Sequence, residues 1–226
     1  MTTPALPGIL IEGTDFVGKT TLANSLVSRL KQRGVVAEHR KCFLNKSAIV
    51  AFLSDFIDGH TLEERDWLLT AAYLLDDACP EQLTGFAIQE RNWFSQIVRN
   101  EFFHGAKFQE STAKIEERHF QFDVQIYLSS NIDAKKRRAA ARAPKGPRDQ
   151  LLAADPALHQ RFDDYSLSRL PKNESWMIID TSDISPDVLC ARVLSAAEQV
   201  IKRRVGAESR DRQALEVGRA VAEASL

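Results

Sequence analysis

The sequence is poor in cysteine, carries almost no net charge and contains no long apolar run. Its 226 residues include three cysteines, Cys42, Cys79 and Cys190, whose spacings fit neither a CxxC motif nor a metal-ligand pattern. A small, odd number of cysteines is typical of a reducing compartment rather than of a disulfide scaffold. No apolar stretch approaches the ~20 residues that a membrane span needs. Residues 1–7 also lack the features of a signal peptide, so we expect a cytoplasmic protein without a membrane partner.

The charges are balanced, with 30 lysines and arginines against 31 aspartates and glutamates. This balance gives no support for a general nucleic-acid surface, so any basic site must be local. The length suffices for one α/β domain with a substantial core and does not require two. We predict one domain over residues 1–206. Beyond Gly206 the chain turns polar, and we predict that 207–226 form a tail that is either an appended helix or partly disordered.

The clearest motif lies near the N-terminus, where residues 8–21 are typical of a short buried strand, a glycine-bounded loop and the start of a helix. The loop matches G-x-x-x-x-G-K-[ST] at Gly13, Gly18, Lys19 and Thr20, the phosphate-binding loop or P-loop. The glycines let the backbone turn tightly and approach a phosphate. The loop amides form an anion-binding nest, and the helix N-terminus points at the same phosphates.

We therefore predict a nucleotide phosphate site over consecutive loop residues. These are Gly13, Thr14, Asp15, Phe16, Val17, Gly18, Lys19, Thr20 and Thr21. Lys19 would reach the β- and γ-phosphates, and the Thr20 hydroxyl would ligate Mg²⁺. A chance match in a glycine-containing turn is disfavoured, because a β-branched-rich run precedes the loop and leucines at helical spacing follow it.

Strands and helices alternate along the remaining chain, which indicates a parallel sheet flanked by helices. The predicted strands lie at 8–11, 35–41, 86–89, 122–128 and 176–180, and the predicted helices lie at 19–33, 47–58, 61–79, 92–103, 132–143, 155–170 and 185–203. Ligands of such sheets bind at the carboxyl ends of the strands. Arg40 lies near the carboxyl end of the second predicted strand. It either binds a substrate phosphate or belongs to a solvated loop. Glu90 and Arg91 follow a buried strand, where a charged pair is costly unless it is used or paired.

A basic run follows the fourth strand, and it predicts a lid over about 137–150. The basic residues of this region include Lys135, Lys136, Arg137, Arg138, Arg142, Lys145 and Arg148. Phosphoryl transfer needs cations that offset charge on the transferring group. A charge run is more often a solvated face, and that alternative stays open.

This order of motifs resembles the thymidylate kinase family of P-loop kinases. The sequence IEGTDFVGKTTLANSL at 11–26 resembles the family's E-G-x-D-x-x-G-K-T-T. Residues 90–95 are similar to its D-R-[YF]-x-x-S, and also to the E-R-S of the related deoxynucleoside kinases. The resemblance covers about residues 7–203. It implies an α/β P-loop kinase fold with a five-stranded parallel sheet, ATP and Mg²⁺, and a small nucleotide-like acceptor rather than a nucleic acid.

Carried over by position, the resemblance implies catalytic roles for Lys19, Asp15, Glu90, Arg91 and Arg142. Asp15 would contact the sugar hydroxyl or phosphate side of the acceptor, and Arg91 would hold its phosphate. Glu90 would organise Mg²⁺ together with Thr20, or act as a base if the acceptor is a hydroxyl. Some members place an arginine where this chain has Phe16. The lid arginines Arg138, Arg142 and Arg148 are therefore the candidates for stabilising the transition state, with Arg142 first.

The acceptor side departs from the family pattern. The predicted acceptor residues are Asp15, Arg40, Tyr73, Arg91, Arg99 and Asn100. Tyr73 replaces a helical arginine of the family and either packs in the core or stacks on a flat ring. Thymidylate, a modified nucleotide, a nucleoside or another phosphorylated metabolite all fit.

We expect a nucleoside monophosphate kinase. The alternatives are a kinase for a nucleoside or another metabolite hydroxyl, and an ATP-binding regulator without turnover. A GTPase is disfavoured, because residues 45–48 lack the carboxylate of N-K-x-D. The apolar stripe at 62–75 permits a homodimer, since family members often dimerise through long helices, but the same stripe also serves a core.

Overall fold

A computed structural model describes residues 6–42, 60–78, 85–108, 110, 112–113, 121–141, 154–170, 172 and 176–223. The predicted helix at 47–58 lies outside these residues. The strands are β1 (Leu6–Glu12), β2 (Ala37–Lys41), β3 (Phe86–Glu90), β4 (Phe122–Ser129) and β5 (Trp176–Asp180). The helices are α1 (Lys19–Gln32), α3 (Leu62–Ala78), α4 (Trp93–His104), α6 (Ile132–Ala140), α8 (Pro156–Ser168) and α9 (Pro186–Glu223), with a short 3₁₀ helix, η1, at Gly105–Phe108.

The strands form one parallel sheet in the order β2-β3-β1-β4-β5. Since β1 lies in the centre, Ile11 aligns with Glu90 on one side and with Ile126 on the other. A strand with buried neighbours on all sides is typically a continuous apolar run, and Ile9, Leu10 and Ile11 are 0% exposed. The five-stranded parallel sheet flanked by helices, which the sequence predicted, is confirmed.

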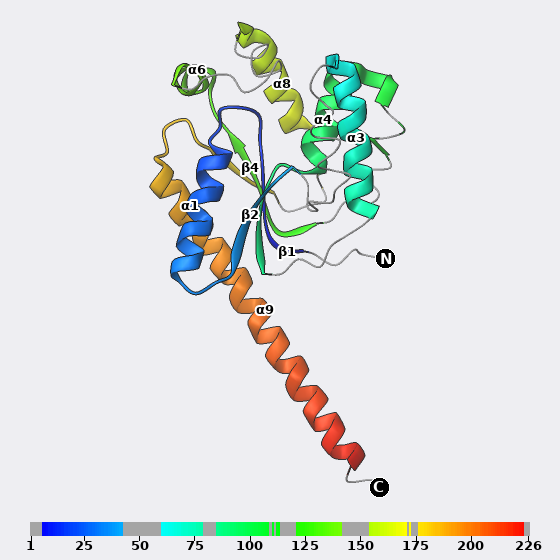
Figure 1. Ribbon diagram of the computed structural model, residues 1–226. Coiled ribbons are helices and arrows are strands. Elements are labelled where there is room, and N and C mark those ends of the chain that lie inside the picture. Colours follow the sequence, from blue (N-terminus) through cyan, green and yellow to red (C-terminus); the bar gives the residue numbers. More distant parts are fainter. Residues whose placement is uncertain are drawn as a thin grey trace.

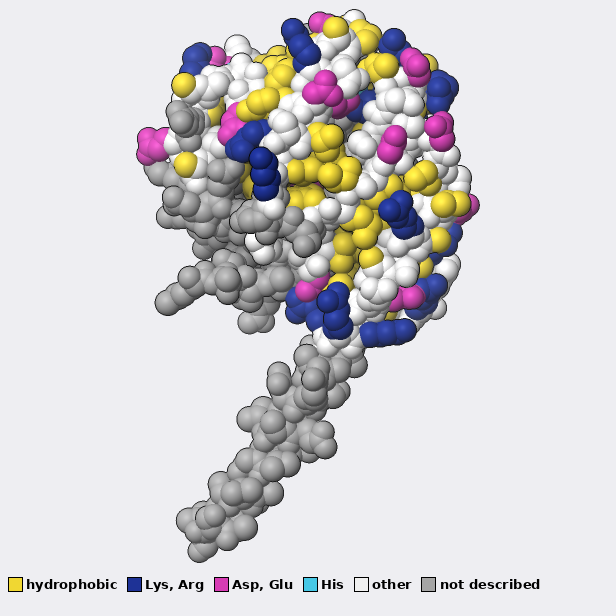
Figure 2. Space-filling view, turned by 180° about the vertical axis from the view of Figure 1, so that it is seen from behind, with side chains coloured by type: hydrophobic (Ala, Val, Ile, Leu, Met, Phe, Trp, Pro, Cys, Tyr) yellow, Lys and Arg dark blue, Asp and Glu magenta, His cyan; other side chains and the backbone are white. Residues whose placement is uncertain are grey.

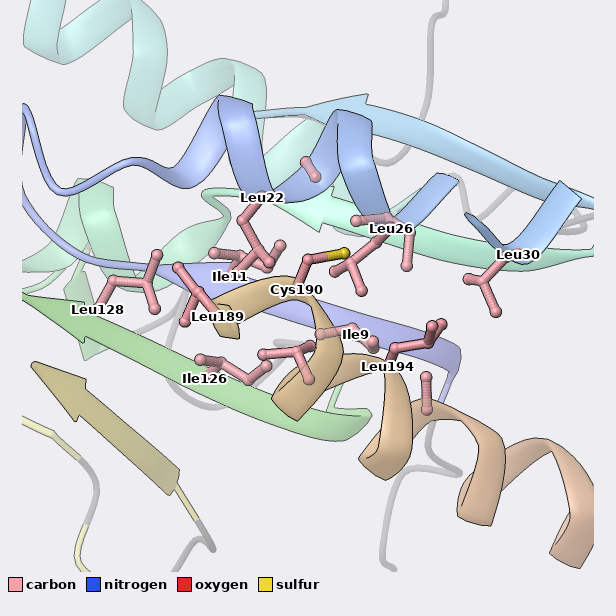
Figure 3. Close-up of a cluster of buried hydrophobic side chains, with 14 of the residues drawn as sticks. Ile9, Ile11, Leu22, Leu26, Leu30, Ile126, Leu128, Leu189, Cys190 and Leu194 are labelled. Carbon is pink, nitrogen blue, oxygen red and sulfur yellow. The ribbon is translucent and has the colours of Figure 1, made fainter. Parts of the chain in front are cut away.

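Helices cover both faces of the sheet, with α1 and α9 on one side and α3, α4 and α8 on the other (Figure 1). The α1/α9 side holds the larger apolar cluster, in which side chains of β1, β4, α1 and α9 interdigitate (Figure 3). Its fully buried members include Leu22, Leu26 and Leu30 of α1, whose spacing had predicted this apolar stripe. Each such leucine contributes roughly 1.5–3 kcal/mol relative to an exposed one.

The opposite side holds an aromatic cluster that includes Tyr73, Trp93, Phe94 and Phe162. This arrangement follows from the alternation of side chains along β1: Ile11 points to the α1/α9 side, while the carboxylate of Glu12 bonds to α4. The sheet therefore separates an apolar side from a mixed one, and both sides meet at the carboxyl ends of the strands.

The last helix is longer than the sequence predicted. A helix end near Arg203 is wrong, because α9 continues through Gly206 to Glu223 and extends away from the sheet (Figure 1). One glycine costs a helix about 1 kcal/mol, which does not by itself end it. The domain boundary at 206 stays a prediction.

The face opposite the view of Figure 1 carries basic and acidic side chains interspersed with apolar ones (Figure 2). This mixture agrees with the balanced composition of the chain. Among the described helices, none combines the length and the apolar character that crossing a membrane requires.

Candidate active site

The P-loop connects β1 to α1, and both of its glycines are required by the geometry. Gly13 has φ +134°, and a Cβ there would lie 2.3 Å from the carbonyl oxygen of Leu128. Gly18 has φ +96° and caps the N-terminus of α1. Phe16, between them, also has a positive φ of 65°. A non-glycine residue in this region stores strain, as functional loops often do.

Lys19 is the first residue of α1 and lies inside the loop, where its ammonium group donates to the carbonyl oxygen of Thr14. Only 5% of this lysine is exposed. Burial, and then the neighbouring Arg91, lower its pKa to about 7, although Asp15 and Glu90 oppose the shift. A phosphate bound in the loop would add further negative charge and so favour the protonated form of this buried lysine.

Thr20 and Glu90, the two predicted metal ligands, are brought together. The Thr20 hydroxyl donates to Glu90 Oε1 over 2.8 Å. Burial raises the pKa of Glu90, but Lys19 and the Thr20 hydrogen bond outweigh it and hold that pKa below its ordinary value. A hydroxyl and a carboxylate beside a phosphate site suit Mg²⁺, which takes oxygen ligands and usually binds through one or two protein groups plus substrate phosphates. The described residues contain no group of three or more His, Cys, Asp or Glu that could hold a metal alone.

Sequence reasoning missed His39, which contacts the same carboxylate. His39 Nε2 lies 3.1 Å from Glu90 Oε2, and its Nδ1 lies 3.0 Å from Asn24 Oδ1. The signal was the strand alternation along β2, since His39 and Arg40 must point to opposite faces. His39 therefore orients Glu90 from the β2 side, while Thr20 orients it from α1.

Arg91 and Asp15, both predicted acceptor residues, form an ion pair with each other. Their side chains are 14% and 15% exposed. Burial raises the pKa of Asp15, but Arg91 and Lys19 outweigh it and hold that pKa well below its ordinary range. Arg91 has φ 61°, and its backbone N–H donates to Ile11 over 3.0 Å. A strained backbone thus holds a buried guanidinium beside the P-loop.

Glu12 is a second residue of the site, after His39, to which the sequence analysis gave no role, although it belongs to the motif at 11–26. It is 0% exposed and accepts hydrogen bonds from the Asn92 backbone N–H at 2.8 Å and from Ser95 Oγ at 2.5 Å. Burial raises its pKa, and both hydrogen bonds oppose that shift. Glu12 therefore ties the N-terminus of α4 to β1 and fixes the position of Arg91 between them.

The other predicted acceptor residues are engaged within the protein. Tyr73 is 4% exposed and belongs to the aromatic cluster. Asn100 is 0% exposed; it accepts from Gln96 at 2.7 Å and donates to Thr70 at 2.8 Å. Arg40 bonds to Glu38 at 3.2 Å. The acceptor roles of these residues stay predictions.

Arg99, the remaining acceptor candidate, is half-buried on α4 and lies close enough to Asp15 to contribute to its lowered pKa, after Arg91 and Lys19. Its acceptor role likewise stays a prediction.

Of the lid arginines, Arg138 is described, while Arg142 and Arg148 lie outside the described residues. Arg138 donates to the carbonyl oxygen of Phe16 at 3.0 Å, to Ser130 at 3.2 Å and to the carbonyl oxygen of Thr181 at 2.5 Å. Its guanidinium therefore fastens the P-loop to the segments that follow β4 and β5. In this structure Arg138 therefore links these three segments.

No protein-family model matches the chain, and no curated protein matches its sequence. Among solved structures, the thymidylate kinase of Candida albicans matches with a TM-score of 0.62 and 18% sequence identity, over 88% of this chain and 93% of that one. That structure is described as revealing the origin of the enzyme's broad substrate specificity. At this level of identity the likeness lies in the fold. The chain thus has a thymidylate kinase-like fold, as its motifs predicted.

Proposed function

We propose that this protein is an ATP- and Mg²⁺-dependent kinase that phosphorylates a nucleoside monophosphate. The observation that carries the proposal is the ion pair between Arg91 and Asp15, which places a buried guanidinium beside the P-loop. A phosphate-binding nest with a buried arginine next to it suits two phosphate-bearing molecules. The thymidylate kinase-like fold supports a nucleotide kinase.

In the proposed reaction, an oxygen of the acceptor phosphate attacks the γ-phosphorus of ATP, the bond to the bridging oxygen breaks, and ADP leaves. The loop amides and Lys19 would hold the β- and γ-phosphates. Arg91, fixed by Asp15, would hold the acceptor phosphate in line with them. Thr20 and Glu90 would hold Mg²⁺, which offsets phosphate charge when bound.

The contacts of Glu90 favour a phosphate acceptor over a hydroxyl acceptor. A hydroxyl kinase needs a base, and a carboxylate is a weaker base when its pKa is lowered. Lys19 and Thr20 lower the pKa of Glu90 against the effect of burial, and His39 also contacts it. These contacts suit a carboxylate that organises a metal ion better than one that takes a proton.

The proposal does not fix which base the acceptor nucleotide carries. The family's arginine beside the base corresponds to Tyr73 here, and Tyr73 is buried among aromatic side chains. The structural neighbour is described as having broad substrate specificity, which supports testing a wide panel of acceptors. The apolar stripe of α3 permits a homodimer but also serves a core; Trp67 on that helix is 43% exposed and stacks on Phe108.

The test is an ADP-release assay with ATP and Mg²⁺ against ribo- and deoxynucleoside monophosphates, their nucleosides and a blank. Turnover with a monophosphate is expected. Arg91→Ala is expected to raise the acceptor KM and to lower kcat, because it removes the cation that positions the acceptor phosphate. Arg204→Ala is the matched control, since Arg204 pairs with Asp123 at 2.7 Å at the opposite end of the sheet.

Three outcomes would contradict the proposal in different ways. Turnover with nucleosides alone would make Glu90 a general base. ATP binding without any transfer would indicate a regulator. Unchanged kinetics in Arg91→Ala would remove Arg91 from the acceptor site.

A further inference from the structure

A lysine on the helix that leads into the predicted lid is buried against the P-loop. Lys135 of α6 is 2% exposed, and lysine is rarely buried to this extent unless its charge is paired. Its ammonium group donates to Thr14 Oγ1 at 2.9 Å and forms an ion pair with Asp163 of α8. Three segments that are distant in the sequence therefore meet at one cation.

Thr14 is the point at which two lysines contact the loop. Its carbonyl oxygen accepts from Lys19, and its hydroxyl accepts from Lys135. Lys19 is the residue that reaches the β- and γ-phosphates in loops of this sequence. Because both ammonium groups bond to the same loop residue, Lys135 lies beside the place where the terminal phosphates of a nucleotide would be held.

Two cavities border Lys135. It lines a cavity of about 300 Å³ together with Phe16 and His159. It lines a second cavity of about 220 Å³ together with Thr14 and Asp163. A lysine ammonium sits on a flexible four-carbon stem, so it can move from a carboxylate to a nearby phosphate without a shift of α6.

The neighbouring loop residue supplies no cation here, and the nearby Arg138 already bonds to other protein groups. Phe16, in the middle of the P-loop, carries no charge. Arg138 bonds to the carbonyl oxygens of Phe16 and Thr181 and to Ser130. Within the described part of α6, Lys135 is thus the cation that contacts a side chain of the P-loop and borders these two cavities.

We propose that Lys135 binds the terminal phosphate of a nucleoside triphosphate and makes the site prefer the triphosphate over the diphosphate. This inference rests on the proposed kinase function. With no nucleotide bound, Asp163 and Thr14 hold the ammonium group. A γ-phosphate carries more negative charge than Asp163, so the ammonium transfers to it and offsets charge on the group that is transferred.

The test compares the binding of Mg²⁺–ADP with that of the Mg²⁺ complex of the β,γ-imido analogue of ATP, by titration calorimetry. Lys135→Met is expected to weaken binding of the analogue about tenfold or more, since it removes a charge-assisted hydrogen bond, and to leave ADP binding close to wild type. Lys135→Arg is expected to restore part of the preference. Lys107→Met is the control, because Lys107 forms an exposed ion pair with Glu63 at 3.0 Å on η1.

Asp163→Asn provides a second measurement that does not depend on folding of the Met variant. It removes the carboxylate that competes for the ammonium group, so the preference for the analogue over ADP is expected to rise. An equal loss for both nucleotides in Lys135→Met, or an unchanged ratio in both variants, would overturn the inference. A wild-type protein that binds neither nucleotide would instead overturn the proposed function, and this inference with it.

Discussion

The two sides of the sheet bury different kinds of residue, although the same strands supply both. On the side of α1 and α9 the core is apolar, and Ile9, Leu26 and Cys190 are all 0% exposed (Figure 3). On the side of α3, α4 and α8, polar groups are buried as well, among them Gln96 and Asn100 at 1% and 0% exposure. One side therefore resembles an ordinary core, while the other requires internal hydrogen bonds.

The two sides become similar only at the carboxyl ends of the strands. On β1 the apolar Leu10 is followed two residues later by Glu12, which faces the same side. On β3 the apolar Ile88 is followed in the same way by Glu90. Each row of packed side chains thus ends in a buried carboxylate that anchors part of the site, at 0% exposure for Glu12 and 3% for Glu90. We therefore expect stability and the proposed chemistry to depend on different residues, which substitutions can separate.

The largest expected effect is on stability, from the apolar side. Leu26→Ala leaves a cavity between β1, α1 and α9, and should lower the free energy of unfolding by about 2–5 kcal/mol. Urea denaturation measures this loss, and kcat well below the unfolding midpoint should not change. Val188→Ala on the exposed surface of α9 is the control, expected within about 0.5 kcal/mol of wild type. A folded Leu26→Ala protein with a large loss of kcat would contradict the expectation that stability and activity depend on different residues.

The next effect is on activity, from the edge of the sheet. In the proposed reaction Lys19 would contact the transferring phosphates, so Lys19→Ala should lower kcat/KM by about 10²–10³. Because burial lowers the pKa of Lys19 to about 7, its charge is unfavourable in the empty site, and its removal should not lower the unfolding midpoint. Lys31→Ala, exposed on the same helix, is the control for both measurements. A lower midpoint with normal kcat/KM would assign Lys19 to the core instead.

The sequence was most informative where a structural feature is formed by residues that are close together in the sequence. The P-loop itself spans only a few consecutive residues, so the spacing of its glycines, Lys19 and Thr20 predicted where the loop lies between β1 and α1. The same holds for the leucine stripe of α1. The order of motifs along the chain was enough to predict the fold, because a βαβ pattern admits few arrangements.

The sequence was least informative where a contact joins distant elements. His39 and Glu90 are 51 residues apart and meet because β2 and β3 pair in one register. Lys135 and Thr14 are 121 residues apart, and their contact depends on how α6 packs above the P-loop. Sequence reasoning placed Lys135 in a basic run and expected a solvated face or a lid. Its near-complete burial depends on Asp163, which no spacing rule connects with it.

The smallest predicted effect tests a purely local interaction, at the start of α3 on the mixed side. Thr61 and Glu64 form a capping box: Thr61 N–H donates to Glu64 Oε2 at 2.8 Å, and Glu64 N–H donates to Thr61 Oγ1 at 3.3 Å. Thr61→Ala removes the hydroxyl cap and should lower the free energy of unfolding by about 1 kcal/mol. Thr61→Ser keeps the hydroxyl and is the control.

The same capping box predicts that the free energy of unfolding depends on pH, and the lowered pKa of Glu64 fixes the sign of this dependence. The backbone hydrogen bond from Thr61, and then its hydroxyl, lower the pKa of Glu64 below the ordinary value of 4.5. The unfolded chain therefore takes up a proton first as the pH falls, so the contribution is fully present above about pH 4.5 and is lost as the pH drops through the folded-state pKa. Urea denaturation of wild type and Glu64→Gln should give a constant difference near neutral pH that shrinks in acid. A difference that stays constant in acid would show that the cap does not depend on the charge of the Glu64 carboxylate.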